Sequence, residues 1–209
     1  MVTTPTHGQA NWDIPLNAAL NDLQDQININ PVADGEWMPS DQSYVAWSID
    51  PALAVNSSIL TAGAMTLIRV AVRAKAATTV LVSNIEIGVG TAGVTLTAGQ
   101  NFAALYNTAG TRLAVTADQS AVWTSTGHKT MALTVPQNLA AGYYWIGILP
   151  NGTTPPQLTR ASSAASVNSK TTAATSRFGS FGAGQTATPA SITPATITPV
   201  NIAFFGGIS

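Results

Sequence analysis

The sequence contains no cysteine and few charged residues. Without cysteine the chain can form neither disulfides nor thiolate metal sites. Charged residues make up 8% of the 209 residues, against about 25% in an average globular protein. Globally disordered chains are usually rich in charge and poor in apolar residues, whereas this chain is 45% apolar. We therefore expect a folded protein with an uncharged polar surface.

Long hydrophobic runs are also missing from the sequence. No apolar run approaches the roughly 20 residues that a membrane-spanning helix needs. The N-terminus shows no basic region followed by an apolar region, so no secretory signal peptide is predicted. We expect a protein that is made in the cytoplasm and is not inserted into a membrane.

The few charges are distributed unevenly along the chain. Seven of the nine acidic residues lie at or before Asp50, and no Lys or Arg precedes Arg69. After Asp118 the only charged residues are Lys and Arg. This asymmetry reflects either random sequence drift in a charge-poor protein or complementary charge between subunits. Four scattered basic residues after Asp118 are too few for a nucleic-acid interface, so no nucleic-acid partner is expected.

Residues 1–35 are predicted to form a leader that contains one short helix. Asp13 is a suitable N-cap, Pro15 fits the first turn, and Pro31 ends the helix. A helix of this length is marginal alone in water, so its apolar stripe needs a partner: the body of the chain, sister copies or a larger assembly. The residues expected to serve oligomerisation or attachment are Trp12, Pro15, Leu16, Leu20, Leu23 and Ile27, of which the last four have heptad spacing.

Residues 36–160 are predicted to form an all-β domain. Short apolar segments, several of them alternating, are separated by turn residues throughout this region. About eight such strands are typical of a two-sheet antiparallel β-sandwich, and a jelly roll is the preferred topology. The expected strands are residues 44–49, 66–74, 79–89, 101–106, 113–116, 121–124, 129–135 and 142–149.

Residues 161–209 are predicted to be a linker followed by an extended arm. A stretch of small residues opens at Ala161, and a five-residue repeat with one proline per repeat covers residues 188–202. This proline spacing argues against a helix and against a central strand. Because apolar residues recur with the same period, we expect the arm to dock on the sandwich or on a neighbouring subunit. The expected anchors are Ile192, Ile197, Ile202, Phe204 and Phe205.

Motifs typical of enzymes and cofactor sites lack their required context. Residues 88–93 match the dinucleotide pattern G-x-G-x-x-G, but strand residues follow where a helix is needed, which favours a hairpin turn. His7 and His128 have no neighbouring cluster of metal ligands. His128 and Asp118 could belong to a Ser-His-Asp triad, yet no serine stands in a nucleophile motif. The chain is therefore expected not to be an enzyme, and no metal or cofactor is expected.

Four aromatic residues of the β-domain are candidates for contacts with a ligand or a neighbouring subunit. On one predicted strand Tyr143 and Trp145 point to one face and Tyr144 to the other. An exposed aromatic ring on a surface rich in Thr, Ser and Asn can stack on a sugar. The same rings are also typical of a core or a subunit interface, which is the interpretation we favour. The candidates are Tyr106, Trp123, Tyr143 and Trp145.

Two parts of the sequence resemble a known group of proteins. The segment Gly-Gln-Ala-Asn-Trp-Asp-Ile-Pro-Leu-Asn (residues 8–17) resembles the start of many phage minor tail and tail-fibre proteins, where such a turn precedes a short helix. Several β-domain segments are similar to β-sandwich domains of tail and receptor-binding proteins of phages that infect actinobacteria. These segments are residues 96–102, 105–106, 117–120, 123–127 and 141–147. The resemblance implies a virion protein, a homotrimer that contacts other virion proteins through its leader.

Three functional hypotheses follow. The first is a tail or baseplate fibre that attaches by its N-terminus and presents trimeric β-sandwich heads to the host surface, with a host glycan as a possible partner. The second is a head fibre or capsid decoration protein without a receptor role. The third is a carbohydrate-binding or carbohydrate-degrading domain of a cellular protein, which requires an exposed aromatic platform or two converging carboxylates.

Overall fold

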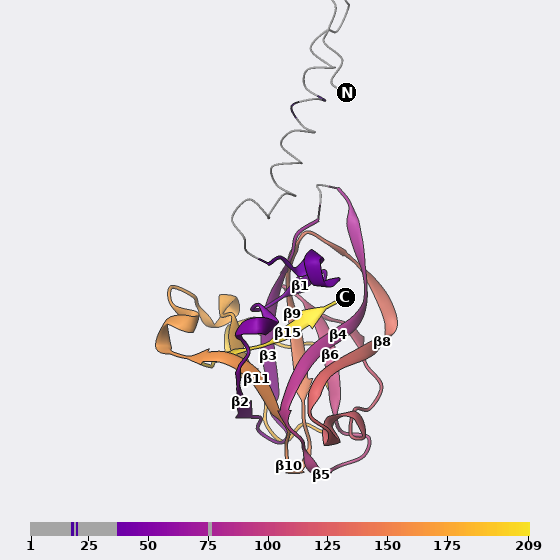
Figure 1. The fold of residues 1–209 in the computed structure, drawn as a ribbon, viewed down its shortest axis with the longest axis vertical. Coiled ribbons are helices and arrows are strands. Elements are labelled where there is room, and N and C mark those ends of the chain that lie inside the picture. The colour runs from indigo at the N-terminus through magenta and orange to yellow at the C-terminus, as the bar shows by residue number, and fades with distance from the viewer. Residues whose placement is uncertain (1–17, 19, 21–36, 75–76) are drawn as a thin grey trace, which may run out of the picture. The chain divides into compact units, whose positions relative to one another are not determined.

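The computed structural model describes residues 18, 20, 37–74 and 77–209. Residues 1–38 form one unit, and Pro39–Ser209 form a second, compact unit. The second unit consists of two facing antiparallel sheets, so the all-β sandwich predicted from the sequence is confirmed (Figure 1). Among the described residues, no helix has the length and apolar character needed to cross a membrane.

The first sheet has seven strands. Its main path runs in the order β1-β15-β4-β11-β14, with β2 paired to β11 and β8 paired to β4. The strands are β1 (Ala46–Trp47), β2 (Asn56–Ile59), β4 (Thr79–Thr91), β8 (Gly127–Ala140), β11 (Gln157–Ser163), β14 (Ile202–Phe204) and β15 (Gly206–Ile208). The final strand of the chain therefore lies between the first strand and β4.

The second sheet has six strands in the order β13-β12-β3-β9-β6-β7. They are β3 (Met65–Val72), β6 (Phe102–Asn107), β7 (Arg112–Val115), β9 (Gly142–Leu149), β12 (Phe178–Phe181) and β13 (Thr198–Pro199). A separate pair consists of β5 (Val94–Leu96) and β10 (Gly152–Thr154). Short 3₁₀ helices in the connections are η2 (Pro39–Gln42), η3 (Pro51–Leu53), η4 (Val122–Thr124), η5 (Ala165–Asn168), η6 (Ala173–Thr175) and η7 (Pro194–Thr196).

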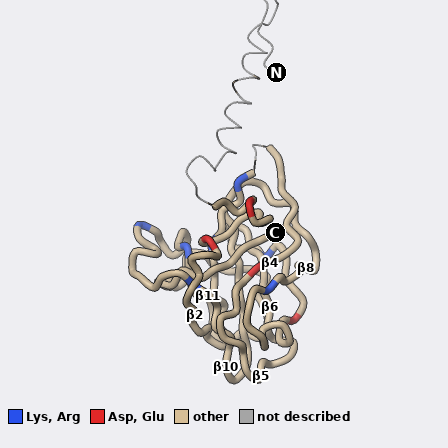
Figure 2. Tube along the Cα trace, in the orientation of Figure 1, with Lys and Arg blue, Asp and Glu red and all other residues tan. Residues whose placement is uncertain are grey.

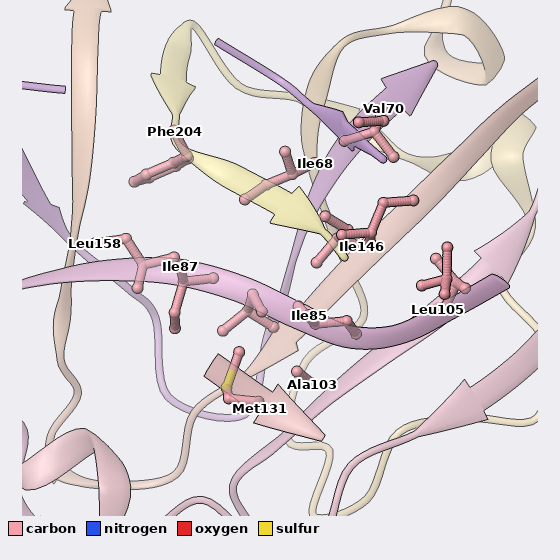
Figure 3. Close-up of a cluster of buried hydrophobic side chains, with 14 of the residues drawn as sticks. Ile68, Val70, Ile85, Ile87, Ala103, Leu105, Met131, Ile146, Leu158 and Phe204 are labelled. Carbon is pink, nitrogen blue, oxygen red and sulfur yellow. The ribbon is translucent and has the colours of Figure 1, made fainter. Parts of the chain in front are cut away.

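The main hydrophobic core lies between the two sheets. Alternation along each strand directs one set of side chains inward, as expected for β3, where Ile68 and Val70 face the core. Ile85 and Ile87 of β4 come from the opposite sheet and meet them, as Figure 3 shows. Because Ile68, Ile85 and Ile87 have no exposed surface, truncating any of them would leave a cavity.

A second buried cluster lies on the outer face of the second sheet. Met65 and Leu67 of β3 and Trp145 of β9 point away from the main core into this cluster. Ile192 and Ile197 of the C-terminal segment cover them, and both are only 3% exposed. The C-terminal segment therefore covers part of the outer face of the second sheet as a third layer.

The C-terminal segment (residues 161–209) is an integral part of the sandwich. It supplies β12 and β13 to the second sheet and β14 and β15 to the first. The domain boundary predicted at residue 160 falls inside β11, so it does not separate two structural units. Pro199 lies on β13 at the edge of its sheet, where the missing N–H removes no ladder hydrogen bond.

Two local predictions are wrong. Residues 121–124 were expected to be a strand but contain η4, because the N–H groups of Val122 and Trp123 both donate to the Gln119 carbonyl. Residues 88–93 were expected to form a hairpin turn, but β4 runs on to residue 91 and β5 pairs with β10. At residues 121–124 a tight turn overrides the local pattern. At residues 88–93 pairing with strands that are distant in the sequence does so.

The two glycines inside β4 allow close packing. A Cβ atom on Gly88 would lie 2.2 Å from Thr159 Oγ1 on β11. A Cβ atom on Gly90 would lie 2.5 Å from Ser57 Cβ on β2. The G-x-G pattern thus reflects the close approach of β11 and β2 to β4.

Asn168 joins the start of β12 to the end of β13. Its Nδ2 donates to the carbonyls of Phe178 (3.0 Å) and Val200 (2.8 Å). Its Oδ1 accepts from the backbone N–H groups of Arg177 (2.8 Å) and Phe178 (3.2 Å). One side chain therefore satisfies four backbone groups of the C-terminal segment.

We predict that Asn168→Asp lowers the free energy of unfolding by about 2 kcal/mol or more, because a carboxylate oxygen would face two carbonyl oxygens. Urea unfolding at neutral pH measures this loss. Asn138→Asp, at an exposed position of β8, is the control and is expected to change stability by less than about 0.5 kcal/mol. Equal stability of the two variants would contradict the role given to Asn168.

Candidate functional site

Three of the four candidate aromatics belong to the interior. Tyr106, Trp123 and Trp145 have no exposed surface. The indole N–H of Trp123 donates to Met131 Sδ at 3.2 Å, and the Tyr106 hydroxyl donates to the Pro189 carbonyl at 3.0 Å. Burial raises the pKa of Tyr106 well above its ordinary value. These three side chains are core residues, which agrees with the favoured interpretation of packing and removes them as candidates for ligand or subunit contacts.

Tyr143 differs from the other three because 53% of its surface is exposed. As expected, it shares the outer face of β9 with Trp145, while Tyr144 packs against the main core. The covering layer of the C-terminal segment buries Trp145 completely but leaves Tyr143 open. Tyr143 therefore stands where the covered part of the outer face ends.

Arg69 of β3 fixes the ring of Tyr143. Its guanidinium carbon lies 4.1 Å from the Tyr143 ring centroid and 5.6 Å from that of Trp145, both within cation–π range. Arg69 Nη1 donates to the Thr175 carbonyl at 2.7 Å. Burial lowers the pKa of Arg69, and Tyr143 opposes this shift. The backbone of Tyr143 is also held, since Thr108 Oγ1 donates to its carbonyl at 2.6 Å.

A second polar cluster surrounds Glu86, which the sequence analysis did not select. Glu86 is only 4% exposed and lies on β4, out of phase with its apolar neighbours. His128 Nε2 is 2.8 Å from Glu86 Oε2, and Ser209 Oγ donates to Glu86 Oε1 at 2.8 Å. The ring of Tyr44 packs edge-on against His128, and burial together with the charge of Glu86 raises the pKa of Tyr44.

The Glu86 cluster does not have the arrangement of a hydrolase triad. Ser209 and His128 both bind the carboxylate, whereas a nucleophile must hydrogen-bond to its base. Asp118, proposed as a triad member, binds elsewhere: it accepts from the Asn101 N–H at 3.0 Å and from the Ser120 hydroxyl. The feature of the sequence that could have identified Glu86 is a single acidic residue between the apolar residues of β4.

Asp118 makes the stability of the sandwich dependent on pH. Burial alone would raise its pKa, but hydrogen bonds from the Ser120 hydroxyl and from backbone N–H groups outweigh burial and lower it. A lowered folded-state pKa stabilises the fold above the unfolded pKa, and this stabilisation is lost as the pH falls through the folded pKa. We predict that between pH 6 and pH 3 the wild type loses more stability than Asp118→Asn. Urea unfolding at both pH values measures the difference, and equal losses would contradict the assignment.

The remaining predicted residues are placed as follows. Trp12, Pro15, Leu16, Leu23 and Ile27 of the leader, and His7, lie outside the described residues, so the expected helix and its attachment role remain predictions. Leu20 is described and is 54% exposed. In the C-terminal segment Ile192, Ile197, Phe204 and Phe205 are buried, and Ile202 is half-buried.

Charges and metal ligands are sparse in the part of the chain that the structure describes. Figure 2 shows the few acidic and basic residues separated along the trace. No group of three or more His, Cys, Asp or Glu that could hold a metal ion occurs among these residues. No protein-family model matches the chain, and no curated protein matches it significantly.

Proposed function

We propose that the chain is a structural virion protein of a bacteriophage, a tail or baseplate fibre with a receptor-binding head. In this proposal the leader attaches the chain and joins three copies, and the sandwich is presented to the host surface. Trimeric presentation raises apparent affinity even when each site is weak. The protein has no catalytic role, and the virion is its location.

The arrangement of the chain ends is the observation that carries the proposal. β1, the first strand after the leader, pairs with the final strand β15, with Ala46 opposite Ile208 and Trp47 opposite Gly207. The first strand of the sandwich therefore lies beside its last strand, so both ends of this unit meet in the first sheet. In Figure 1 the β5–β10 pair lies at the bottom of the sandwich, away from β1 and β15. A sandwich whose first and last strands pair with each other suits a head carried on an attachment segment.

The burial of Tyr106, Trp123 and Trp145 favours a second candidate, a head fibre or capsid decoration protein without a receptor role. The same burial removes three of the four aromatics that a carbohydrate-binding module would present. Binding to cell walls separates the two virion roles. A receptor-binding head is expected to sediment with walls from at least one of a panel of actinobacteria, and a decoration protein with none.

We predict that the full chain is a homotrimer of 21.4 kDa subunits. Size-exclusion chromatography with light scattering at micromolar concentration measures the mass. Deleting residues 1–30 removes the apolar stripe and is expected to give a folded monomer, because the sandwich has its own core. A monomeric full chain, or a deletion variant that remains trimeric, would contradict the role given to the leader.

A further inference from the structure

The exposed ring of Tyr143 is rigidly held and half open to solvent. Its backbone is bound by Thr108, and Arg69 covers it at 4.1 Å. Arg69 is itself anchored to the Thr175 carbonyl. A flat ring fixed in this way loses little conformational entropy when a second flat group packs on it. The pair therefore has the rigidity of a preformed stacking surface.

Arg69 brings positive charge to this ring. The carboxylates of Asp50, Glu86 and Asp118 are engaged elsewhere, with Ala52, His128 and Asn101. Arg73, just after β3, is exposed and adds a second positive charge.

Two buried N–H groups of Arg69 and Trp145 have no acceptor among the residues that the structure describes. They are Arg69 Nε and Trp145 Nε1, both shielded from solvent. Unpaired donors leave positive partial charge beneath the surface, where desolvation makes it costly. Negative charge close to Arg69 would lower this cost. The electrostatics of the site therefore favour an anionic ligand over a neutral one.

We propose that Tyr143 and Arg69 form a binding site for an acidic saccharide. A pyranose ring packs on the open part of the Tyr143 ring, and its carboxylate or phosphate group is held by the charges of Arg69 and Arg73. Thr108 at the Tyr143 backbone and Thr175 of η6 at Arg69 add hydroxyl groups. This site rests on the proposed receptor role, for which it names the class of ligand.

Isothermal titration of the full chain at low salt tests the site. The probes are polygalacturonate (carboxylate), a glucosylated glycerol-phosphate polymer (phosphate) and dextran (neutral). We expect binding to at least one acidic polymer and none to dextran, with affinity that falls as salt is added. The acidic probe that binds identifies which anionic group the site accepts.

Variants connect this binding to the ring. Tyr143→Ala is expected to weaken binding about tenfold, a loss of about 1.4 kcal/mol, and Tyr143→Phe is expected to retain most of it. Arg73→Gln is expected to weaken binding and to reduce its salt dependence. Val135→Ala, which removes an exposed apolar side chain on the other sheet, is the control and should bind like the wild type.

Three results would overturn the site: no binding to either acidic polymer, equal binding by wild type and Tyr143→Ala, or a changed oligomeric mass for Tyr143→Ala. The last result would identify this face as a subunit interface. Cell-wall sedimentation separates failure of the saccharide site from failure of the proposed function. Wall binding that is indifferent to Tyr143 overturns the site alone, whereas a trimer that binds no wall overturns the receptor role as well.

Discussion

Removing residues 188–209 is expected to abolish folding of the sandwich. The truncated chain should be recovered as aggregate or as a soluble species without a cooperative unfolding transition. Five of the deleted side chains are at most 3% exposed: Ile192, Ile197, Phe204, Phe205 and Ile208. Losing one large apolar core side chain costs about 2–5 kcal/mol, so losing five costs about 10–25 kcal/mol, which matches or exceeds the roughly 5–15 kcal/mol that stabilises a typical domain.

The position of the deleted strands strengthens this prediction. β15 lies between β1 and β4, so its removal leaves a gap inside the first sheet and unpaired backbone groups on both neighbours. Ser209 adds hydrogen bonds at the same place, because its carbonyl accepts from the N–H groups of Ser83 (2.7 Å) and Asn84 (2.8 Å). Circular dichroism and thermal unfolding of the truncated chain measure the outcome.

A milder substitution keeps the prediction testable if the truncated chain cannot be purified. Ile197→Ala is expected to destabilise the protein by about 2–5 kcal/mol, since Ile197 is buried against the outer face of the second sheet. Ile202→Ala, at a half-buried position of the same repeat, serves as the control and should cost less. A truncated chain that unfolds cooperatively at the wild-type midpoint would refute the structural role of this segment.

Gly110→Ala is expected to lower the free energy of unfolding by about 3 kcal/mol or more, from backbone strain and overpacking. Gly110 has a φ of +92°, and a Cβ atom there would lie 2.1 Å from the carbonyl oxygen of Ile192. Because that oxygen belongs to the backbone, a rotamer change cannot relieve the contact. The proline-spaced stretch would have to move away, and the hydrogen bond from the Ile192 N–H to the Gly110 carbonyl (2.8 Å) would break.

Gly99→Ala is the matched control for this substitution. Gly99 also has a left-handed backbone, with a φ of +74°, but no atom lies within 4 Å of the position of an added Cβ. Its expected cost is therefore the backbone strain alone, roughly 1–2 kcal/mol. Urea unfolding of both variants gives the comparison. Equal losses would show that contact with the Ile192 carbonyl is unimportant, and would remove the evidence that Gly110 positions the C-terminal segment.

The sandwich could be predicted from alternation because each strand buries one face. Ile68 and Val70 on β3, and Ile146 and Ile148 on β9, all face the core as their spacing indicates. The sequence did not reveal that part of the outer face of the second sheet is buried too. That face carries Arg69 as well as Met65 and Leu67, a mixed pattern that does not indicate burial, and its cover comes from residues more than a hundred positions away.

The candidate site could be predicted only in part. Alternation correctly placed Tyr143 and Trp145 on one face, but local sequence does not say how far a covering segment extends along a strand. The contact between Arg69 and Tyr143 depends on the register of β3 against β9, in which Ala71 lies opposite Tyr143. Register is a tertiary property, so neither this contact nor the pairing of Glu86 with His128 could be derived from spacing along the chain.

The position of the protein on intact phage particles tests the proposed function most directly. Antibodies raised against the sandwich, Pro39–Ser209, can be visualised with gold by electron microscopy of purified virions. The account predicts gold at the tail tip or baseplate, in multiples consistent with trimers, and blocked adsorption to host cells. Gold confined to the head shell, or particles that carry no label, would contradict it.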